Sequence, residues 1–290
     1  NSVELIEIQA GASLGRVQFD SSILAVHRVN KGFMIVLPFE CAFVAESLGT
    51  ITKIPLFEDS PVLSVASDAD HYYFLFDDGR VDVYSLTKAS FAKKSSFKVS
   101  EGSTNLYWWD SEQSFVVLSS HNNELWLWQR RANSRFQLRK GTYRLEERGL
   151  YHFRWIKEHQ NGAAFICVGE RGFYQIYRID NAQSAPMLKL EIVTEAESDL
   201  TVELDLHNEV LAIGESCNLY LWRGIDFLSM DEESIKIDDD STIETQRIES
   251  FDGIVTLLQL VGHNRVAVGL TGSLFKCMEL PPRDRLDDTA

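Results

Sequence analysis

The residue types that could do chemistry in this 290-residue chain are scattered rather than grouped in motifs. The chain lacks the Gly-x-Ser-x-Gly of a serine nucleophile, the Gly-x4-Gly-Lys of a phosphate-binding loop and the His-Glu-x-x-His of a zinc enzyme. His152 and His159 are the closest pair among the seven histidines, and a metal site would need a third ligand that no nearby motif provides. We therefore expect turn and edge histidines, no bound metal or cofactor, and no enzymatic activity.

The clearest charge signal is a basic segment within an acidic chain. The net charge is −15, but residues 88–148 hold eleven bases and six acids, so this segment is +5 and the remainder is −20. Most of the bases lie on or beside two expected strands, at 88–98 and 135–145. The sequence predicts a partner-binding basic patch formed by Lys93, Lys94, Arg130, Arg131, Arg135, Arg139, Lys140 and Arg144.

This basic patch has two interpretations. Lysines on the outer edge of a sheet discourage pairing with other strand edges, so the patch is explained as a solvated rim. The alternative is a docking site for an acidic peptide or a nucleic-acid backbone. The acidic total argues against wrapping of nucleic acid by the whole surface, since nucleic-acid-binding domains are usually basic.

Residues 226–249 have the opposite charge character, with nine acids and two bases. This composition is typical of a mobile insertion loop that aids solubility. Ser229 and Ser241 each precede an acid by three residues, a weak pattern for acid-directed kinases. Residues 281–290, PPRDRLDDTA, are interpreted as a linker or tail after a single domain spanning residues 1–280.

The cysteine and glycosylation patterns favour a reducing compartment. The four cysteines are far apart with no Cys-x-x-Cys, and the chain has no Asn-x-Ser/Thr sequon. No run of 18 apolar residues and no basic start followed by an apolar segment is present. We expect an intracellular protein, nuclear or cytoplasmic, without membrane partners, and the initial Asn indicates a fragment or a processed chain.

A repeated pattern must position these residues. An apolar strand, a short polar turn and an alternating strand recur at 23–37, 72–86, 115–130, 164–179, 210–224 and 265–280. The turns contain Asp-Gly, Arg-Gly, Asn-Asn or similar pairs, which tolerate the positive φ of tight hairpins. The aligned terminal positions, Val36, Tyr84, Trp128, Tyr177, Trp222 and Cys277, are 44 to 55 residues apart.

Each hairpin is preceded by another strand, from RVQFDSS at 16–22 to VTLLQLVGHN at 255–264, and several are followed by a more polar fourth strand. Four antiparallel strands per 40–50 residues indicate an all-β propeller of six countable blades, with seven as the alternative. Residues 4–9 are expected to complete the last blade and so close the ring. A β-sandwich is the competing all-β fold, but it does not explain the regular spacing.

The blade ends resemble those of the WD-repeat propellers. The Trp-Asp pair of that family appears in degenerate form as Trp128-Gln129 and Trp222-Arg223, while the family's Gly-His pair is missing from its usual place. Trp126 and Trp128 alternate with leucines, which favours packing between blades over ligand stacking. Of the pair Trp108-Trp109, one ring is expected to reach the surface as a partner hot spot.

The resemblance implies a non-catalytic interaction scaffold that belongs to a multiprotein complex and holds more than one protein partner. Two alternatives remain. One is a subunit that contacts nucleic acid through the basic patch. The other is a propeller enzyme, whose central site would be built from the few polar residues of the inner strands, Arg16, Arg154, Glu203 and Asp205.

Overall fold

The computed structural model describes most of the chain as β-strands and their turns. The described residues are 2–7, 12–29, 32–45, 51–55, 60–86, 91–99, 101–119, 124–130, 136–145, 152–159, 162–170, 172–181, 184–193, 200–205, 210–223, 235–237, 246–261, 264–272 and 274–280. They include no helix, and therefore no helix long and apolar enough to cross a membrane. The chain forms two compact units: unit 1 holds residues 1–6, 13–164 and 179–186, and unit 2 holds the others.

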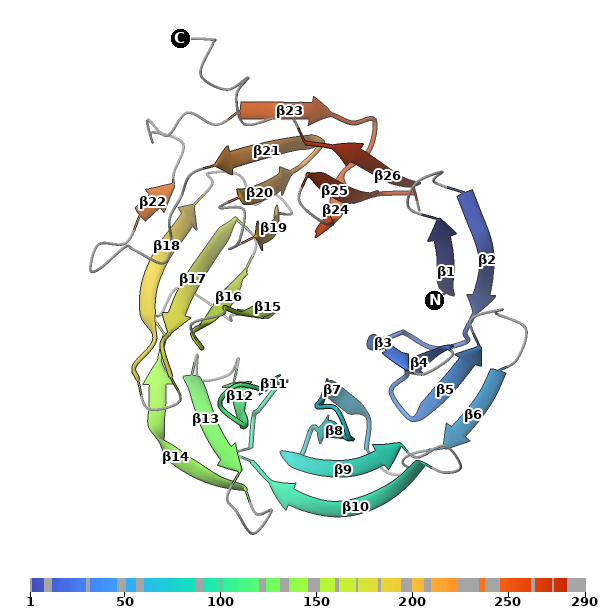
Figure 1. Ribbon diagram of the computed structural model, residues 1–290, viewed down its shortest axis with the longest axis vertical. Helices are drawn as coiled ribbons and strands as arrows, with labels where there is room; N and C mark the ends of the chain where they lie inside the picture. The colour runs from blue at the N-terminus through green and yellow to red at the C-terminus, as the bar shows by residue number, and fades with distance from the viewer. Residues whose placement is uncertain are drawn as a thin grey trace. The chain divides into compact units, whose positions relative to one another are not determined.

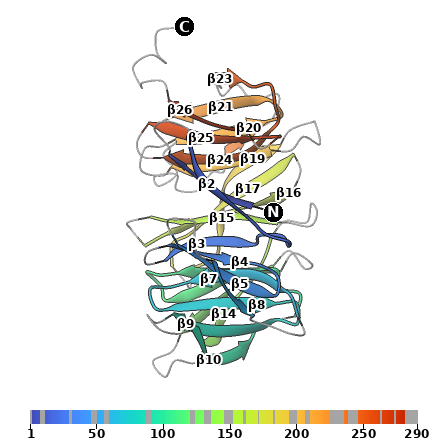
Figure 2. The same cartoon turned by 90° about the vertical axis from the view of Figure 1, so that its right-hand side faces the viewer.

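Three four-stranded antiparallel sheets belong to unit 1 (Figure 1). Blade 1 consists of β3 (Ala25–Val29), β4 (Gly32–Val36), β5 (Glu40–Ala45) and β6 (Ile51–Pro55). Blade 2 consists of β7 (Val62–Ser67), β8 (His71–Phe76), β9 (Arg80–Leu86) and β10 (Phe91–Lys98). Blade 3 consists of β11 (Asn105–Trp109), β12 (Ser114–Ser119), β13 (Glu124–Arg130) and β14 (Phe136–Arg144). Figure 2 shows β10 at the outer side of blade 2.

The later sheets depart from the four-stranded pattern in two places. Blade 4 has the order β15 (His152–Glu158), β16 (Ala164–Glu170), β17 (Phe173–Ile179), β18 (Met187–Val193) and β22 (Ile235–Ile237). Blade 5 has the order β19 (Leu200–Asp205), β20 (Val210–Glu215), β21 (Asn218–Arg223) and β23 (Gln246–Ser250). Blade 6 has three strands among the described residues, β24 (Val255–Val261), β25 (Arg265–Leu270) and β26 (Leu274–Glu279).

The predicted hairpins at 72–86, 115–130, 164–179, 210–224 and 265–280 form the second and third strands of their blades. The first repeat differs from the prediction by one strand. The hairpin at 23–37 was expected to hold the second and third strands of its blade, but it forms the first and second strands, β3 and β4, of blade 1. Val36 therefore ends a second strand rather than a third. A sequence such as Asn30-Lys31-Gly32 predicts a hairpin, but it does not reveal which two strands of a blade that hairpin contains.

The N-terminal strands do not show the predicted closure. β1 (Ser2–Glu7) pairs with β2 (Ala12–Gln18) in a separate two-stranded sheet. Val17 on β2 and the adjoining Phe19 pack against Ile35 and Val44 of blade 1. Closure of the last blade by residues 4–9, and a single domain over 1–280, stay predictions.

Part of the acidic insertion predicted at 226–249 is ordered as strands. β22 pairs in parallel with β18, with Ile235 opposite Leu190 and Ile237 opposite Ile192, so residues 235–237 extend the edge of blade 4. β23, which is the fourth strand of blade 5, begins at Gln246. The insertion is therefore not a simple loop in these two places. Residues 226–234 and 238–245, with Ser229 and Ser241, and the tail at 281–290 lie outside the described residues.

A bulge recurs between the third and fourth strands of blades 2 to 5. In blade 2, Lys94 is an extra residue on β10, between the pairs Lys93–Tyr84 and Ser95–Val83. Lys189 of β18 and Ile248 of β23 occupy the same kind of position, and β14 has a wider irregularity that spans Arg139 and Lys140. Bulges twist an outer strand and hinder edge-to-edge pairing. The shared bulge supports the repeat read from the sequence.

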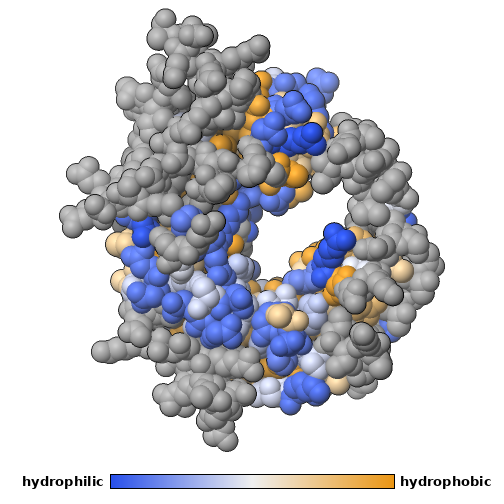
Figure 3. All heavy atoms as spheres, viewed as in Figure 1, coloured by the Kyte–Doolittle hydropathy of each residue, from blue (hydrophilic) through white to orange (hydrophobic). Residues whose placement is uncertain are grey.

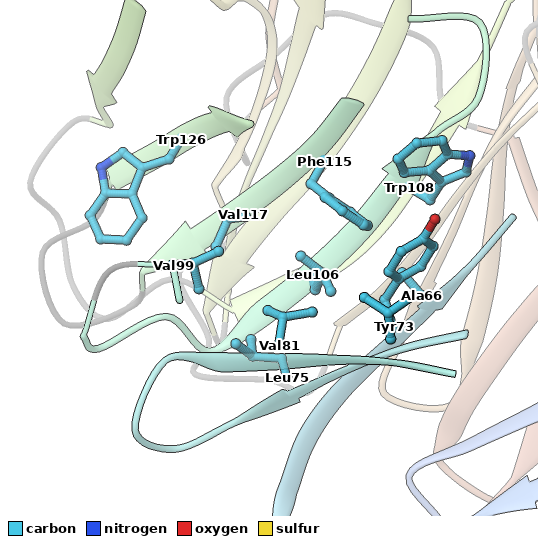
Figure 4. Packing of buried hydrophobic residues seen from close by; sticks show 11 residues of the cluster. Ala66, Tyr73, Leu75, Val81, Val99, Leu106, Trp108, Phe115, Val117 and Trp126 are labelled. Carbon is cyan, nitrogen blue, oxygen red and sulfur yellow. The ribbon is translucent and has the colours of Figure 1, made fainter. Parts of the chain in front are cut away.

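The core lies between neighbouring blades, as Figure 4 shows for blades 2 and 3. Phe115 meets Tyr73 edge-on with ring centroids 4.6 Å apart, and it meets Trp108 at 4.9 Å. Tyr73 stacks on Trp108 at 5.5 Å. Trp108, Trp109 and Trp126 are all buried, so the expectation that Trp108 or Trp109 reaches the surface is wrong. These rings serve packing between sheets.

Candidate interaction surfaces

The described part of the predicted basic patch consists of three side chains in unit 1. Lys93 and Lys94 are exposed on β10, and Arg144 is exposed at the end of β14. The backbone of Arg130, Arg139 and Lys140 lies in β13 and β14, but their side chains fall outside the described part. Arg131 and Arg135 lie outside the described residues altogether. Convergence of the eight side chains on one surface therefore stays a prediction.

Lys93 and Lys94 differ although they are adjacent in sequence. The Lys93 ammonium lies 2.8 Å from the carboxylate of Asp82, which is only 1% exposed in the third strand of the same blade. The Asp82 carboxylate also lies 3.0 Å from the Arg80 guanidinium and accepts a hydrogen bond from the Ser96 hydroxyl at 2.6 Å. A buried carboxylate needs such partners, because water no longer solvates its charge. Lys93 therefore supports the fold, a role that the sequence analysis missed.

We expect Lys93→Ala to lower the free energy of unfolding by about 1–2 kcal/mol, because Asp82 loses one of its charged partners. This cost is modest because Lys93 is 43% exposed and Arg80 remains in place. The matched change Lys94→Ala should alter stability by less than about 0.5 kcal/mol, since Lys94 is an exposed bulge residue. Urea denaturation measures both values, and equal effects would contradict the assignment.

In the turns that follow the inner strands of unit 1, aspartate carboxylates accept hydrogen bonds from the same turn and from aromatic side chains of the core. Asp68, after β7, accepts hydrogen bonds from the Tyr73 hydroxyl at 2.5 Å and from the backbone N–H groups of Asp70 and His71. Asp110, after β11, accepts from the indole N–H of Trp108 at 3.1 Å. Asp68 and Asp110 thus tie turns to the aromatic core, and the segment Ser67–Asp70 forms a structural turn.

A further carboxylate joins blades 3 and 4 on the same unit. Glu158, at the end of β15, accepts from the backbone N–H of Asp110 at 2.9 Å and of Ser111 at 3.3 Å. Asp110 itself holds the side chain of Gln113, which adopts a positive φ of 48° in this turn. Together with burial, the nearby carboxylates Glu158 and Asp110 raise the pKa of Tyr107 to about 12. The carboxylates of Asp110 and Glu158 therefore hold the turn after β11 in its conformation.

The Asp68 turn makes stability depend on acid pH. Burial alone would raise the pKa of Asp68, but hydrogen bonds from Tyr73, Asp70 and His71 outweigh it and place the pKa below the ordinary 3.8. The ionised carboxylate therefore stabilises the fold above about pH 3.8, and this contribution disappears as the pH falls through the lowered value.

We expect Asp68→Asn to cost about 1–2 kcal/mol at pH 7, because the charged acceptor is lost. The difference from the parent protein should shrink as the pH falls below about 4. Denaturant titrations at several pH values measure this difference. A difference that stays constant down to pH 3 would show that the charge of Asp68 plays no part.

The polar residues proposed for an enzymatic centre do not form a described cluster. Arg16 on β2 and Arg154 on β15 are exposed in unit 1, whereas Glu203 is buried and Asp205 half-buried on β19 of unit 2. The Glu203 carboxylate accepts a hydrogen bond from the side-chain amide of Gln259 at 3.1 Å, which links blades 5 and 6. No group of three His, Cys, Asp or Glu side chains that could hold a metal occurs within the described ranges.

The four cysteines form no disulfide bond. Cys41 and Cys167 are buried, whereas Cys217 and Cys277 are half-buried. Burial, with a smaller contribution from Glu40, raises the pKa of the Cys41 thiol far above its usual value. Cys41 is therefore a packing residue rather than a reactive thiol.

The fold is found again in solved structures at low sequence identity. A chain of the mitotic checkpoint complex is 11% identical with a TM-score of 0.63, and the match covers 97% of this chain and 82% of that chain. The C-terminal WD40 domain of Sif2 is 11% identical with a TM-score of 0.61 over 97% and 76% of the two chains. Hydrazine synthase of Kuenenia stuttgartiensis is 11% identical with a TM-score of 0.62 over 94% and 81%.

No family model matches the sequence, and a search of curated proteins found no similar sequence. The fold assignment therefore rests on the sheets and on the structural likeness. The six blades, the recurring bulge and the likeness to a WD40 domain agree with the predicted propeller and not with a sandwich. The chain has the all-β fold of a six-bladed β-propeller, similar to the fold of the WD40 domain of Sif2.

Proposed function

We propose that this chain is a non-catalytic scaffold, a propeller subunit that holds several protein partners in an intracellular complex. The observation that carries the proposal is the fold, which it shares with a chain of the mitotic checkpoint complex over 97% of its length. Propellers present two faces and a rim, so that several partners can bind at once. The lack of disulfide bonds among the four cysteines supports the intracellular placement.

The contacts that the buried and turn carboxylates make within the fold support a scaffold rather than an enzyme. Catalysis needs several polar groups that converge on one reacting position. In unit 1, the carboxylates of Asp68, Asp82, Asp110 and Glu158 bind turns, strands or aromatic rings of the fold itself. The likeness to hydrazine synthase concerns the fold alone, and we keep an enzymatic centre as the alternative to be tested.

Purification from the native source tests the scaffold. The chain, tagged at its endogenous locus, should bring down at least one other polypeptide in a fixed molar ratio that survives washing. The same preparation should turn over none of a panel of ester, phosphoester and glycoside substrates. Recovery as a single polypeptide with substrate turnover would overturn the scaffold and favour the enzyme.

The exposure of Lys94 and Arg144 favours the basic patch as one docking surface for an acidic partner. Charges at an interface rim act mainly on the association rate. Reversing Arg131, Arg135 and Arg139 to Glu should therefore slow complex formation, while the melting temperature stays nearly unchanged. Unfolding of the variant would show that these residues are structural, and an unchanged rate would place the partner elsewhere.

Nucleic acid is the alternative occupant of the basic patch, and competition separates it from an acidic peptide. Phosphate contacts to duplex DNA give a log–log salt dependence with a slope of about −0.9 per contact. An acidic peptide is also salt-sensitive, so displacement by RNA or DNA decides between them. Lack of binding to either nucleic acid at low salt would reject this alternative.

A further inference from the structure

The fourth strand of blade 4, β18, is more deeply buried than the fourth strand of blade 2. In β10 of blade 2, the four consecutive residues 93–96 are exposed, whereas residues 189–192 of β18 are all buried. Figure 3 shows hydrophilic residues at the surface over β10. Lys94, at the bulge of β10, is exposed, but Lys189, at the equivalent bulge of β18, is only 1% exposed. The outer strand of blade 4 is therefore covered within the protein itself.

The outer strands of blades 1, 2 and 3 are protected by charge. Each of them presents an exposed base, namely Lys53 on β6, Lys94 on β10 and Arg144 on β14. Exposed charges on an edge strand discourage pairing with another edge. In β18, with the sequence MLKLEIV, the two charged residues Lys189 and Glu191 are both buried. β18 therefore needs a different protection.

The short strand β22 pairs with the outer edge of β18 (Figure 1). The pairing is parallel, and both strands belong to unit 2. The register matches residues of suited chemistry, apolar with apolar at both ends and base with acid in the middle, in the pairs Ile235–Leu190, Ile237–Ile192 and Lys236–Glu191. A shift by one residue would place an isoleucine opposite Glu191. The sequence of β22 is therefore matched to this edge and to this register.

Glu191 makes the register important for stability. Its carboxylate is 7% exposed and accepts a hydrogen bond from the side-chain amide of Gln175 at 3.1 Å. Gln175 in turn accepts a hydrogen bond from the Tyr177 hydroxyl at 2.6 Å. A buried carboxylate is stable only with partners that compensate for its lost hydration. The register places the base Lys236 on the strand next to this buried network.

The edge of β18 fits a second copy of itself. Two β18 strands that pair antiparallel about Leu190 would place Lys189 of each copy opposite Glu191 of the other. Opposite charges at directly opposed positions stabilise a strand pair. Leu188 of each copy would also lie opposite Ile192 of the other. Such a contact joins two identical surfaces through a two-fold axis, as in most protein dimers.

We propose that residues 235–237 form a built-in edge cover, which keeps β18 from pairing with β18 of a second copy of this chain. The cover pairs with the outward backbone groups of β18 and occupies the place that the second copy would take. This role goes beyond the proposed scaffold function and does not depend on it. It gives a task to part of the acidic insertion, where Ile-Lys-Ile stands between Asp-Glu-Glu at 231–233 and Asp-Asp-Asp at 238–240.

Replacing Ile235 and Ile237 together by Asp removes the cover, because charged residues then stand opposite Leu190 and Ile192. β22 contributes only three residue pairs, so blade 4 should stay folded. Sedimentation equilibrium should show that this variant dimerises at least tenfold more tightly than the parent protein. The control combines Met230→Asp with Ile243→Asp, which adds the same charge to the same insertion outside β22, and its mass should match that of the parent. The added negative charge opposes self-association in both variants, so charge alone does not produce the dimer.

Hydrogen exchange resolved to single residues locates the contact. In the parent protein, the slowest outward amides of 190–192 should exchange at least tenfold more slowly than those of 94–96 on β10. In the double Asp variant they should exchange faster at low concentration and become protected again as the dimer forms. A photo-reactive benzoylphenylalanine at Met187, which is 37% exposed, should then cross-link to residues 187–193 of the second copy.

Three results would overturn the proposal. A double Asp variant with the mass of the parent protein at every concentration would show that β22 prevents no self-association. A dimer whose cross-links lie outside 187–193 would place the contact on another surface. Parent amides at 190–192 that exchange as fast as those of β10 would show that β22 does not cover the edge. This last measurement needs no substitution, so it decides even if the variant fails to fold.

Discussion

Replacing Phe115 by alanine is expected to lower the free energy of unfolding by about 3–5 kcal/mol, the usual range for a fully buried phenylalanine. Phe115 is fully buried and contacts Tyr73, Trp108 and Phe97, so its loss leaves a cavity between blades 2 and 3. The matched change Phe39→Ala should cost less than about 1 kcal/mol, since Phe39 is 52% exposed. Denaturant titration of both variants tests the packing, and similar losses would contradict it.

Gly169→Ala is expected to be comparably severe, at about 3 kcal/mol or more, because overpacking against backbone leaves few ways to relax. A Cβ atom at this position would overlap the carbonyl oxygen of Phe173 and would lie 2.8 Å from the Cα of Tyr174. The two strands of blade 4 would have to separate there.

Gly253→Ala provides the control, because its Cβ would meet the Thr271 hydroxyl at 3.1 Å, a contact that side-chain movement relieves. The melting temperature should fall by many degrees for Gly169→Ala and by little for Gly253→Ala. If Gly169→Ala is as stable as the parent protein, the close spacing of the two strands of blade 4 at Gly169 is wrong.

Hairpins were predictable because their signals are local. A turn such as Asp77-Asp78-Gly79 brings Gly79 to a φ of 74°, and Asp-Gly pairs predict this conformation directly. The position of a hairpin within its blade depends on neighbouring strands, which explains the one-strand error in blade 1. The bulges at Lys94 and Lys189 were missed for the same reason, since register arises from pairing between strands.

The surroundings of the candidate surface residues were only partly predictable. A basic segment in an acidic chain was visible in the composition, and Lys94 is indeed exposed. The ion pair between Lys93 and Asp82 was not visible, because it joins residues on two strands whose register the sequence did not reveal.

The mass of the native particle tests the scaffold most directly. Cell extract from the native source, in which the chain carries a small fluorescent tag, can be fractionated gently and measured by single-particle mass photometry. We predict a particle heavier than the single tagged polypeptide, with a fixed ratio to at least one different polypeptide across dilutions. A particle whose mass equals that of the single tagged polypeptide at every concentration would contradict the account.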